Sequence, residues 1–174
     1  MAKHSTHPGY KIEPLSEHHD RTAFSCGVEA PDIYLHRQAN QDLTRKTAAV
    51  FVLIAAASQA VLGFYTLSSL SLLGVQLPDK LAKKLPSRSP LGVTLFGRMA
   101  VSTQLQGTGL GEFLLLNALE RAWQASQHVA SWAVVVDAKQ GIRDFYLQYG
   151  FIPLPSQPHR LFLPIKTIER LFSA

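Results

Sequence analysis

Three glycines at alternate positions, Gly107, Gly109 and Gly111, follow an apolar segment and precede a run with helical periodicity. Because glycine has no Cβ atom, the backbone can turn sharply there and bring its N–H groups close to a bulky anion. The helix that follows would add the positive end of its dipole at the same place. The spacing therefore predicts a pyrophosphate cradle, although a loop that needs glycine only for its dihedral angles has the same pattern.

Two common phosphate-binding loops are excluded by their spacing. The chain has no Gly-x-x-x-x-Gly-Lys-Ser/Thr run, and neither pair of loop glycines has the third glycine that a Gly-x-Gly-x-x-Gly dinucleotide fingerprint requires. The motif that remains is Gln106-x-x-Gly109-x-Gly111. It resembles the Arg/Gln-x-x-Gly-x-Gly/Ala signature of the Gcn5-related N-acetyltransferases (GNAT), where the loop amides hold the pyrophosphate of acetyl-coenzyme A (acetyl-CoA).

The resemblance implies a binding site for acetyl-CoA that begins at the end of the preceding strand. Its pantetheine arm would lie along residues 99–101 and its pyrophosphate on residues 106–111. The implied cofactor-binding residues are Met99, Ala100, Val101, Gln106, Gly107, Thr108, Gly109, Leu110 and Gly111. Position 108 commonly holds lysine or arginine in the family, so Thr108 weakens the pyrophosphate contact and leaves the backbone cradle intact.

A second segment has the order of the distal half of the same fold. An apolar strand at 131–137 is followed by a helix with Phe145 and Tyr146, and then by Gly150 and Phe151. The resemblance implies that Tyr146 is the catalytic general acid, since a phenol can protonate the thiolate that leaves a thioester. The alternative is an ordinary aromatic pair on a helix. Tyr149 is less suitable, because the family pattern places the functional tyrosine directly after the phenylalanine.

The composition suits one compact domain over residues 1–174, with 47% hydrophobic and 17% charged residues. We expect an α+β GNAT fold, in which helices flank a mixed, mostly antiparallel central sheet. No apolar run is long enough for a membrane span, and the N-terminus lacks the apolar region of a signal peptide. The single cysteine, Cys26, fits a small core residue in a reducing compartment. These features predict a cytoplasmic protein with no membrane partner.

The hydrophobic pattern predicts where the elements lie. Ser16 is a candidate cap for a first helix toward Phe24, and Ser58-Gln59 separates the two strands of a hairpin. The expected strands are 9–15, 48–57, 60–69, 91–101, 130–137 and two short ones near 151 and 161–163. The expected helices are 16–24, 31–44, the helix after the glycine loop and 139–149, with a helical turn at 81–85.

Further motifs resemble one GNAT branch, the acetyltransferase toxins of type II toxin–antitoxin systems. The motifs are Phe24-Ser-Cys-Gly27 with Tyr34-Leu35, Gly63-Phe64-Tyr65-Thr66-Leu67, Phe96-Gly97-Arg98-Met99-Ala100-Val101, Val134-Val135-Val136-Asp137-Ala138, Tyr149-Gly150-Phe151-Ile152-Pro153, and the run from His159 to Ile168. This resemblance implies acetylation of the α-amine of aminoacyl-tRNA, which blocks translation, and a ribbon-helix-helix antitoxin as partner. The sequence leaves monomer and homodimer open.

The charge distribution agrees with a nucleic-acid partner. The formal net charge is +5 at pH 7, and cations outnumber acids between positions 79 and 98. The candidate tRNA-binding residues are Lys80, Lys83, Lys84, Arg88 and Arg98. A solvated loop is the alternative for each of these residues except Arg98, which ends a strand beside the expected cofactor site.

Other chemistry is less well supported. The expected strand at 91–101 carries no acidic residue that could act as a base, which suits an aminoacyl ester because its amine is less basic than that of lysine. The seven histidines lack metal-ligand spacing, so we expect no metal. Two alternatives remain open: a GNAT enzyme that acetylates a protein N-terminus, lysine or small-molecule amine, and a non-catalytic basic module, for which no helix-turn-helix or aromatic platform is seen.

Overall fold

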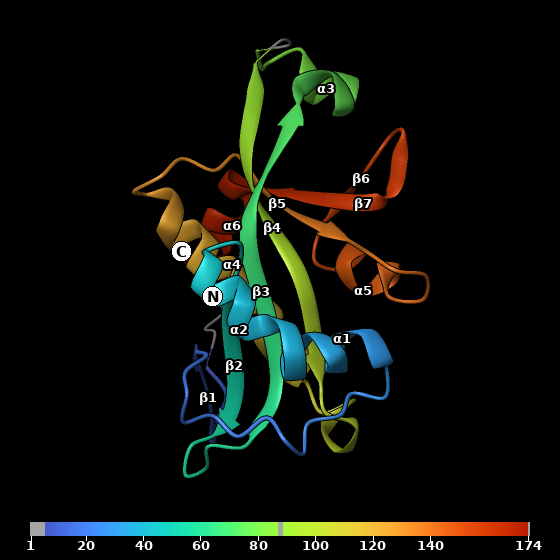
Figure 1. Cartoon of the computed structure of the whole chain (residues 1–174). Coiled ribbons are helices and arrows are strands. Elements are labelled where there is room, and N and C mark those ends of the chain that lie inside the picture. The colour runs from blue at the N-terminus through green and yellow to red at the C-terminus, as the bar shows by residue number, and fades with distance from the viewer. Residues whose placement is uncertain (1–5, 87–88, 174) are drawn as a thin grey trace. The chain divides into compact units, whose positions relative to one another are not determined.

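The computed structural model describes residues 6–86 and 89–173, and its strands form one sheet in the order β1-β2-β3-β4-β5-β7-β6 (Figure 1). The strands are β1 (Tyr10–Pro14), β2 (Ala49–Ala55), β3 (Val61–Leu73), β4 (Pro90–Val101), β5 (Ala133–Asp137), β6 (Ile152–Leu154) and β7 (Gln157–Pro164). Among the strand pairs whose register is described, β4 and β5 are parallel, while β1–β2, β2–β3, β5–β7 and β6–β7 are antiparallel. The prediction of an α+β fold with a mixed, mostly antiparallel sheet is confirmed.

The helices lie between the strands in the predicted order, with three differences described below. They are α1 (Glu29–Ile33), the π-helical segment η1 (Tyr34–Gln38), α2 (Ala39–Arg45), α3 (Asp79–Ala82), α4 (Leu110–Ser126), α5 (Arg143–Leu147) and α6 (Ile165–Phe172), with short 3₁₀ turns η2 (Gly74–Gln76) and η3 (Thr103–Leu105). The predicted hairpin is confirmed, because β2 and β3 pair antiparallel from Ala49 opposite Leu67 onward.

The chain divides into two compact units. Of the described residues, the N-terminal unit contains 6–68 and 97–119, and the C-terminal unit contains 69–86, 89–96 and 120–173. Strands β3 and β4 and helix α4 contribute residues to both. The single domain expected over residues 1–174 stays a prediction.

In the N-terminal unit, strand β2 is apolar on both faces because both are covered. Alternate residues of a strand point to opposite faces, so Val50, Val52 and Ile54 share one side. These three belong to a buried cluster that includes Tyr34 and Leu35 of the helical segment. On the other side, the Phe51 ring stacks on Tyr65, whose hydroxyl donates a hydrogen bond to Asn117 Oδ1 of α4 at 2.7 Å. The continuous run Val50–Ile54 is therefore the pattern of a central strand.

The C-terminal unit is built on the antiparallel pairing of β5, β7 and β6. Val93, Val135 and Phe162 belong to its buried cluster, and the partly buried Trp132 packs against it. At the end of β5, Asp137 lies opposite Arg160 and accepts two hydrogen bonds from its guanidinium, at 2.7 and 2.8 Å. This bidentate ion pair holds the register of β5 and β7 where β5 ends.

The expected helix from Ser16 to Phe24 is wrong. The Ser16 backbone N–H donates to His19 Nδ1 at 2.9 Å, which gives the chain a local alternative to helical bonding. Asp20 then pairs with the hairpin, since its N–H donates to Gln59 O and its carbonyl accepts from the Val61 N–H, each at 2.8 Å. Tertiary hydrogen bonds therefore replace those that a helix would have made.

The hydrophobic pattern of the sequence also did not predict α6 or the π-helical segment. Helix α6 begins directly after Pro164, and its buried residue Ile168 lies one turn into the helix. The expected helix over 31–44 is present from Glu29 to Arg45, but its middle turn is π-helical.

Candidate active site

The glycine loop has an open surface and a backbone that requires glycine. Gly107 and Gly109 have φ values of +78° and +88°, in the left-handed region that other residues rarely adopt. A Cβ atom built on either of them, or on Gly111 in the first turn of α4, meets no described atom within 4 Å. Since the first N–H groups of an α-helix have no acceptors within the helix, the loop and the start of α4 present amides to an open space. This arrangement fits a pyrophosphate group.

Side-chain hydrogen bonds hold the loop in place. The Gln106 amide Nε2 donates to the carbonyl oxygens of Cys26 at 2.8 Å and Val101 at 3.0 Å. The Thr108 hydroxyl donates to the Leu105 carbonyl oxygen, and Leu110 is buried. The side chains of Gln106 and Thr108 therefore hold the loop in shape. The backbone groups of the loop remain available to bind a ligand.

Strand β4 changes its pairing beside this loop. Its parallel register with β5 covers Thr94 to Phe96 and stops there. The following residues of β4 are Gly97 and Arg98, both exposed, and then 99–101, of which Ala100 is buried. Backbone groups that an adjacent strand does not use can bind an extended ligand, as in β-strand addition.

Tyr146 lies in an aromatic environment in the C-terminal unit. The residue is 5% exposed, and its ring meets Phe96, Phe145 and Phe151 edge to face at 6.4, 5.2 and 5.5 Å between centroids. Burial raises the pKa of Tyr146 to about 12. No described residue hydrogen bonds to its hydroxyl. The hydroxyl oxygen is not one of the fully buried, unpaired polar atoms of the described residues, so it keeps some access to solvent. At neutral pH this phenol is protonated and able to donate.

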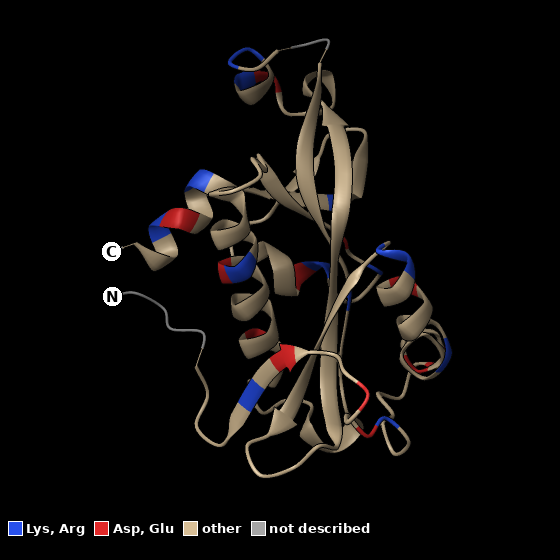
Figure 2. Cartoon of the chain, turned by 60° about the vertical axis from the view of Figure 1, so that its left-hand side comes forward, with Lys and Arg blue, Asp and Glu red and all other residues tan. Residues whose placement is uncertain are grey.

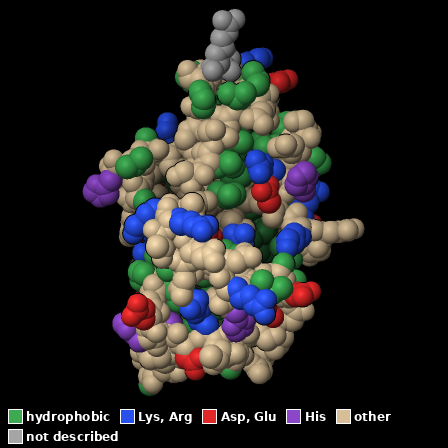
Figure 3. Space-filling model, viewed as in Figure 1, with side chains coloured by type: hydrophobic (Ala, Val, Ile, Leu, Met, Phe, Trp, Pro, Cys, Tyr) green, Lys and Arg blue, Asp and Glu red, His purple; other side chains and the backbone are tan. Residues whose placement is uncertain are grey.

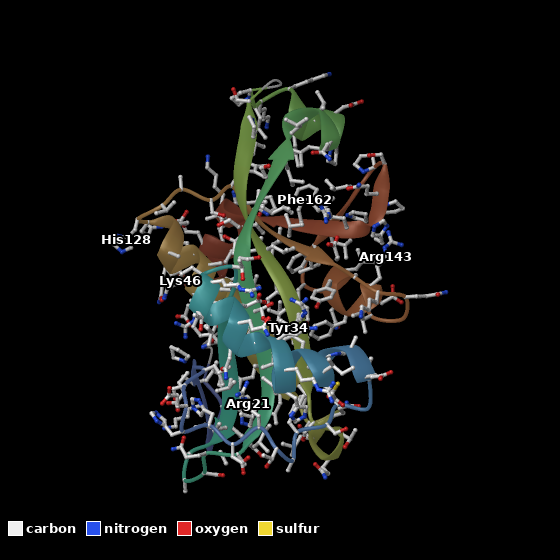
Figure 4. All side chains as sticks on the ribbon, viewed as in Figure 1. Arg21, Tyr34, Lys46, His128, Arg143 and Phe162 are labelled. Carbon is white, nitrogen blue, oxygen red and sulfur yellow. The ribbon has the colours of Figure 1, made fainter. Side chains whose placement is uncertain are left out.

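Arg98 in the N-terminal unit meets residues that the sequence analysis had not treated as a site. Its guanidinium carbon lies 3.9 Å from the centroid of the Tyr34 ring (Figure 4 labels Tyr34). The Tyr34 hydroxyl donates to Asp42 Oδ2 at 2.7 Å, and the Thr47 hydroxyl donates to Asp42 Oδ1 at 2.8 Å. In a regular helix Tyr34 and Asp42 would lie about two turns apart and about 80° apart around the axis, so the sequence pattern did not indicate this contact.

Arg98, Tyr34 and Asp42 form a cluster in which neighbouring groups shift the pKa values of Tyr34 and Asp42. The pKa of Asp42 is lowered, chiefly by the Tyr34 hydrogen bond and also by the positive charges of Arg98 and Arg45. The pKa of Tyr34 is raised well above its usual value, first by burial and then by Asp42. Figure 3 shows Lys and Arg side chains over this helical segment, where the exposed cations are Arg37, Arg45 and Lys46.

The other predicted tRNA contacts lie in the C-terminal unit. Lys80 lies in α3, and Lys83 and Lys84 directly follow this helix. All three are exposed. Figure 2 colours the Lys and Arg positions of the ribbon blue. Arg88 lies outside the described residues. The lysines thus share one short segment, whereas Arg98 belongs to the other unit.

Cys26 belongs to the buried core of the N-terminal unit. Cys26 is 7% exposed, and burial raises the pKa of its thiol, so it is a packed core residue. Within residues 6–86 and 89–173, no three His, Cys, Asp or Glu side chains are grouped to hold a metal ion. No helix in the same ranges is long and apolar enough to cross a membrane.

Comparison with known proteins agrees with this geometry. Residues 92–161 match the family described as the acetyltransferase (GNAT) domain. A probable toxin TacT from Sinorhizobium fredii is 31% identical, over 92% of this chain and 93% of that protein. A tRNA-acetylating toxin from Mycobacterium tuberculosis is 32% identical, over 90% of this chain and 93% of that protein.

Solved structures of toxins have the same fold. A KacT variant with one tyrosine replaced by phenylalanine has a TM-score of 0.87 and 30% identity, and covers 94% of this chain and 99% of its own. AtaT complexed with acetyl-methionyl-tRNAfMet has a TM-score of 0.86 and 32% identity, covering 93% and 98%. A tyrosine-to-phenylalanine AtaT variant bound to acetyl-CoA and the C-terminus of its antitoxin AtaR has a TM-score of 0.80 and 28% identity, covering 95% and 99%.

The fold and the open glycine loop therefore define a GNAT acetyltransferase. Within that family, the chain belongs to the toxins that include TacT and the tRNA-acetylating toxin, with which it shares nearly its whole length. The predicted family is confirmed.

Proposed function

We propose that this chain is a toxin that transfers the acetyl group of acetyl-CoA to the α-amine of aminoacyl-tRNA and thereby blocks translation. The observation that carries this proposal is the open glycine loop at the start of α4, in a chain similar along its length to AtaT. AtaT has been solved with acetyl-methionyl-tRNAfMet, which is the product expected of this reaction.

The acetyl-CoA site comprises the loop and the adjacent end of β4. The backbone amides of 106–111 would bind the pyrophosphate, and the backbone of Met99, Ala100 and Val101 would bind the pantetheine arm. When bound, acetyl-CoA supplies an acetyl group activated as a thioester. The pyrophosphate of acetyl-CoA needs open space and hydrogen-bond donors. The glycine loop offers the space, and the first N–H groups of α4 are the donors.

The protein's own chemistry in this proposal is proton transfer and positioning. Tyr146, whose pKa is about 12, would donate its hydroxyl proton to the departing sulfur. Strand β4 carries no carboxylate to act as a base. An α-amine next to an ester needs none, because the ester lowers its basicity and a useful fraction is neutral near pH 7.

A toxin of this kind requires a neutralising partner and a place of action. We propose that the partner is a ribbon-helix-helix antitoxin and that the protein acts in the cytoplasm, where charged tRNA is found. The solved AtaT complex with the C-terminus of AtaR supports a binding segment at the antitoxin's C-terminal end. Co-expression of a small neighbouring gene should then restore growth and yield a complex on gel filtration.

Incubation with labelled acetyl-CoA and a pool of charged tRNAs tests the proposal directly. Label should appear on the aminoacyl end of charged tRNA and be absent from deacylated tRNA. Lysine peptides, peptides with a free N-terminus and polyamines serve as competing acceptors in parallel reactions. Acetylation of these amines with no label on charged tRNA would contradict the toxin function and favour a general GNAT enzyme.

A further inference from the structure

Arg98 is held in one orientation by contacts on its side chain and its backbone. Its guanidinium lies over the Tyr34 ring, 3.9 Å from the ring centroid, as in a cation–π pair. Its backbone N–H donates to the Thr66 hydroxyl at 3.0 Å, and Thr66 is buried. These contacts fix the position of Arg98 on the strand and hold its guanidinium against the Tyr34 ring.

Gly97 permits the backbone part of this arrangement. A Cβ atom at Gly97 would come within 2.8 Å of Thr66 Oγ1, closer than real Cβ contacts. Any larger residue would displace the hydroxyl that accepts the Arg98 N–H. The Gly97-Arg98 pair therefore allows Arg98 to sit close against β3.

The Tyr34 ring is a fixed platform. It is 2% exposed and stacks on Phe64 at 5.9 Å between centroids, and its hydroxyl is bound to Asp42. In a regular α-helix, residues eight apart differ by about 80° around the axis, since the helix has 3.6 residues per turn. The π-helical turns from Tyr34 to Gln38 hold more residues each and so bring Asp42 closer to the Tyr34 face.

The guanidinium edge is left for a ligand. Arg98 is exposed, no described acid lies within ion-pair distance of it, and no described residue accepts a hydrogen bond from its guanidinium. Its guanidinium carbon lies over the Tyr34 ring, and a guanidinium carries a planar fork of N–H groups whose geometry matches phosphate oxygens. Nearby Arg45 adds positive charge to the same cluster.

We propose that Arg98 binds a phosphodiester of the tRNA acceptor end and that Tyr34, locked by Asp42, is the positioning residue that orients it. This inference rests on the proposed function, because it assigns a phosphate contact to the same substrate. Arg98 precedes 99–101, the residues proposed for the pantetheine arm. A phosphate held there would place the acceptor end relative to the acetyl group.

The test compares two substrates that carry the same reactive amine. One is the charged tRNA that the parent acetylates best, and the other is the methyl ester of its amino acid, which has no phosphate. Arg98→Ala should lower kcat/KM for charged tRNA by about tenfold or more, mainly through KM, and reduce the salt slope by about one phosphate contact. The rate with the methyl ester should stay within about twofold of the parent rate, as for a lost phosphate contact. Arg170→Ala, an exposed arginine on α6, is the matched control and should change neither rate.

Variants of Tyr34 separate positioning from packing. Tyr34→Leu should lower kcat/KM for charged tRNA in the same direction as Arg98→Ala, while Tyr34→Phe, which keeps the ring, should recover most of it. The double variant Tyr34→Leu/Arg98→Ala should be no worse than Arg98→Ala, since residues that act through one another are not additive. Arg98→Lys should recover only part of the binding, because an ammonium cannot form the planar fork. If Tyr34→Leu does not fold, Tyr34→Phe tests the Asp42 contact alone and should show a smaller loss of kcat/KM for charged tRNA in the same direction.

Three results would overturn the inference. They are an unchanged KM and salt slope in Arg98→Ala, an equal loss with tRNA and methyl ester, and additive effects of Tyr34 and Arg98. If the parent acetylates free amines and never charged tRNA, the proposed function fails and this inference fails with it. If the parent acetylates charged tRNA and Arg98→Ala does so equally well, only the inference fails.

Discussion

Two buried tyrosines show how their surroundings give the same side chain different chemistry. The Tyr34 hydroxyl donates to an ionised carboxylate, so its proton is committed to Asp42. Tyr146 is surrounded by phenylalanine rings, and no described residue hydrogen bonds to its hydroxyl. Of the two, Tyr146 alone has a phenol whose proton is free to be given to a ligand. This is why we assign the general acid to Tyr146.

Replacing Tyr146 by phenylalanine should abolish most turnover without unfolding the protein. The substitution removes the hydroxyl and keeps the ring among Phe96 and Phe151, so packing is preserved. We expect kcat to fall by about a hundredfold or more, the range for a lost general acid, with an unchanged dissociation constant for acetyl-CoA. Steady-state kinetics and calorimetry measure the two quantities. Tyr149→Phe is the control, and a larger loss there would mean that the wrong tyrosine was chosen.

The pH dependence should follow the substrate and show no titration of Tyr146. The raised pKa of about 12 keeps the phenol protonated, and therefore able to donate, at every pH below that value. Activity should rise with pH as the α-amine loses its proton and show no fall up to about pH 10, since α-amines titrate near neutrality. Single-turnover initial rates from pH 6 to 10 measure this before the ester hydrolyses. A descending limb in the parent that Tyr146→Phe lacks would show that the Tyr146 pKa is much lower.

At the scale of elements, the glycine loop and the start of α4 together form the proposed pyrophosphate site. Gly107 and Gly109 are needed for their positive φ values, whereas Gly111 is already helical and has open space where a side chain would stand. The backbone conformation explains two of the glycines, and it leaves the third unexplained. The proposed close approach of the pyrophosphate would account for Gly111.

Gly111→Asp should therefore separate folding from binding. Nothing within 4 Å obstructs a Cβ at this position, and an acidic side chain is tolerated in the first turn of a helix, so the free energy of unfolding should stay within about 1 kcal/mol of the parent value. Affinity for acetyl-CoA should fall, because the carboxylate would occupy the space proposed for the pyrophosphate and repel its negative charge. Urea titration and calorimetry on the same sample give both values. Parent-like binding by a well-folded Gly111→Asp would contradict the cradle.

At the scale of the whole molecule, we assign the excess positive charge to the proposed tRNA interaction. The net charge of +5 includes exposed cations beside Arg98 and others after α3. A polyanion as large as tRNA can contact cations far from the reacting amine, and each phosphate contact releases counterions. Such contacts raise affinity and leave the chemical step unchanged.

Charge reversal at Lys83 and Lys84 should weaken tRNA capture alone. In the double variant Lys83→Glu/Lys84→Glu, KM for charged tRNA should rise and its salt dependence should flatten, with kcat and acetyl-CoA binding near parent values. Rates measured across a series of salt concentrations test this. The matched control is Lys166→Glu/Arg170→Glu on α6, which makes the same change in net charge at other exposed residues. Equal effects of the two double variants would mean that only net charge matters.

Local patterns account for the parts of this protein that were predictable from the sequence. The glycine spacing, the hairpin around Ser58-Gln59 and the place of Tyr146 after Phe145 each depend on residues close in the chain. The α+β fold and the GNAT family followed from these patterns and were confirmed. The roles of Tyr146 and of the loop residues stay predictions, which the variants above test.

Long-range contacts decided the rest, and neighbouring residues cannot encode them. The segment after Ser16 is non-helical because the backbone of Asp20 bonds to Gln59 and Val61, about forty residues away. Arg98 gained its orientation from Tyr34 and Thr66, which the sequence separates by dozens of positions. Hydrogen bonds and ring contacts between distant residues compete with local propensity and prevail where burial removes water as the alternative partner. The sequence alone therefore determined which chemistry the chain carries, and the tertiary structure decided which side chains are fixed to perform it.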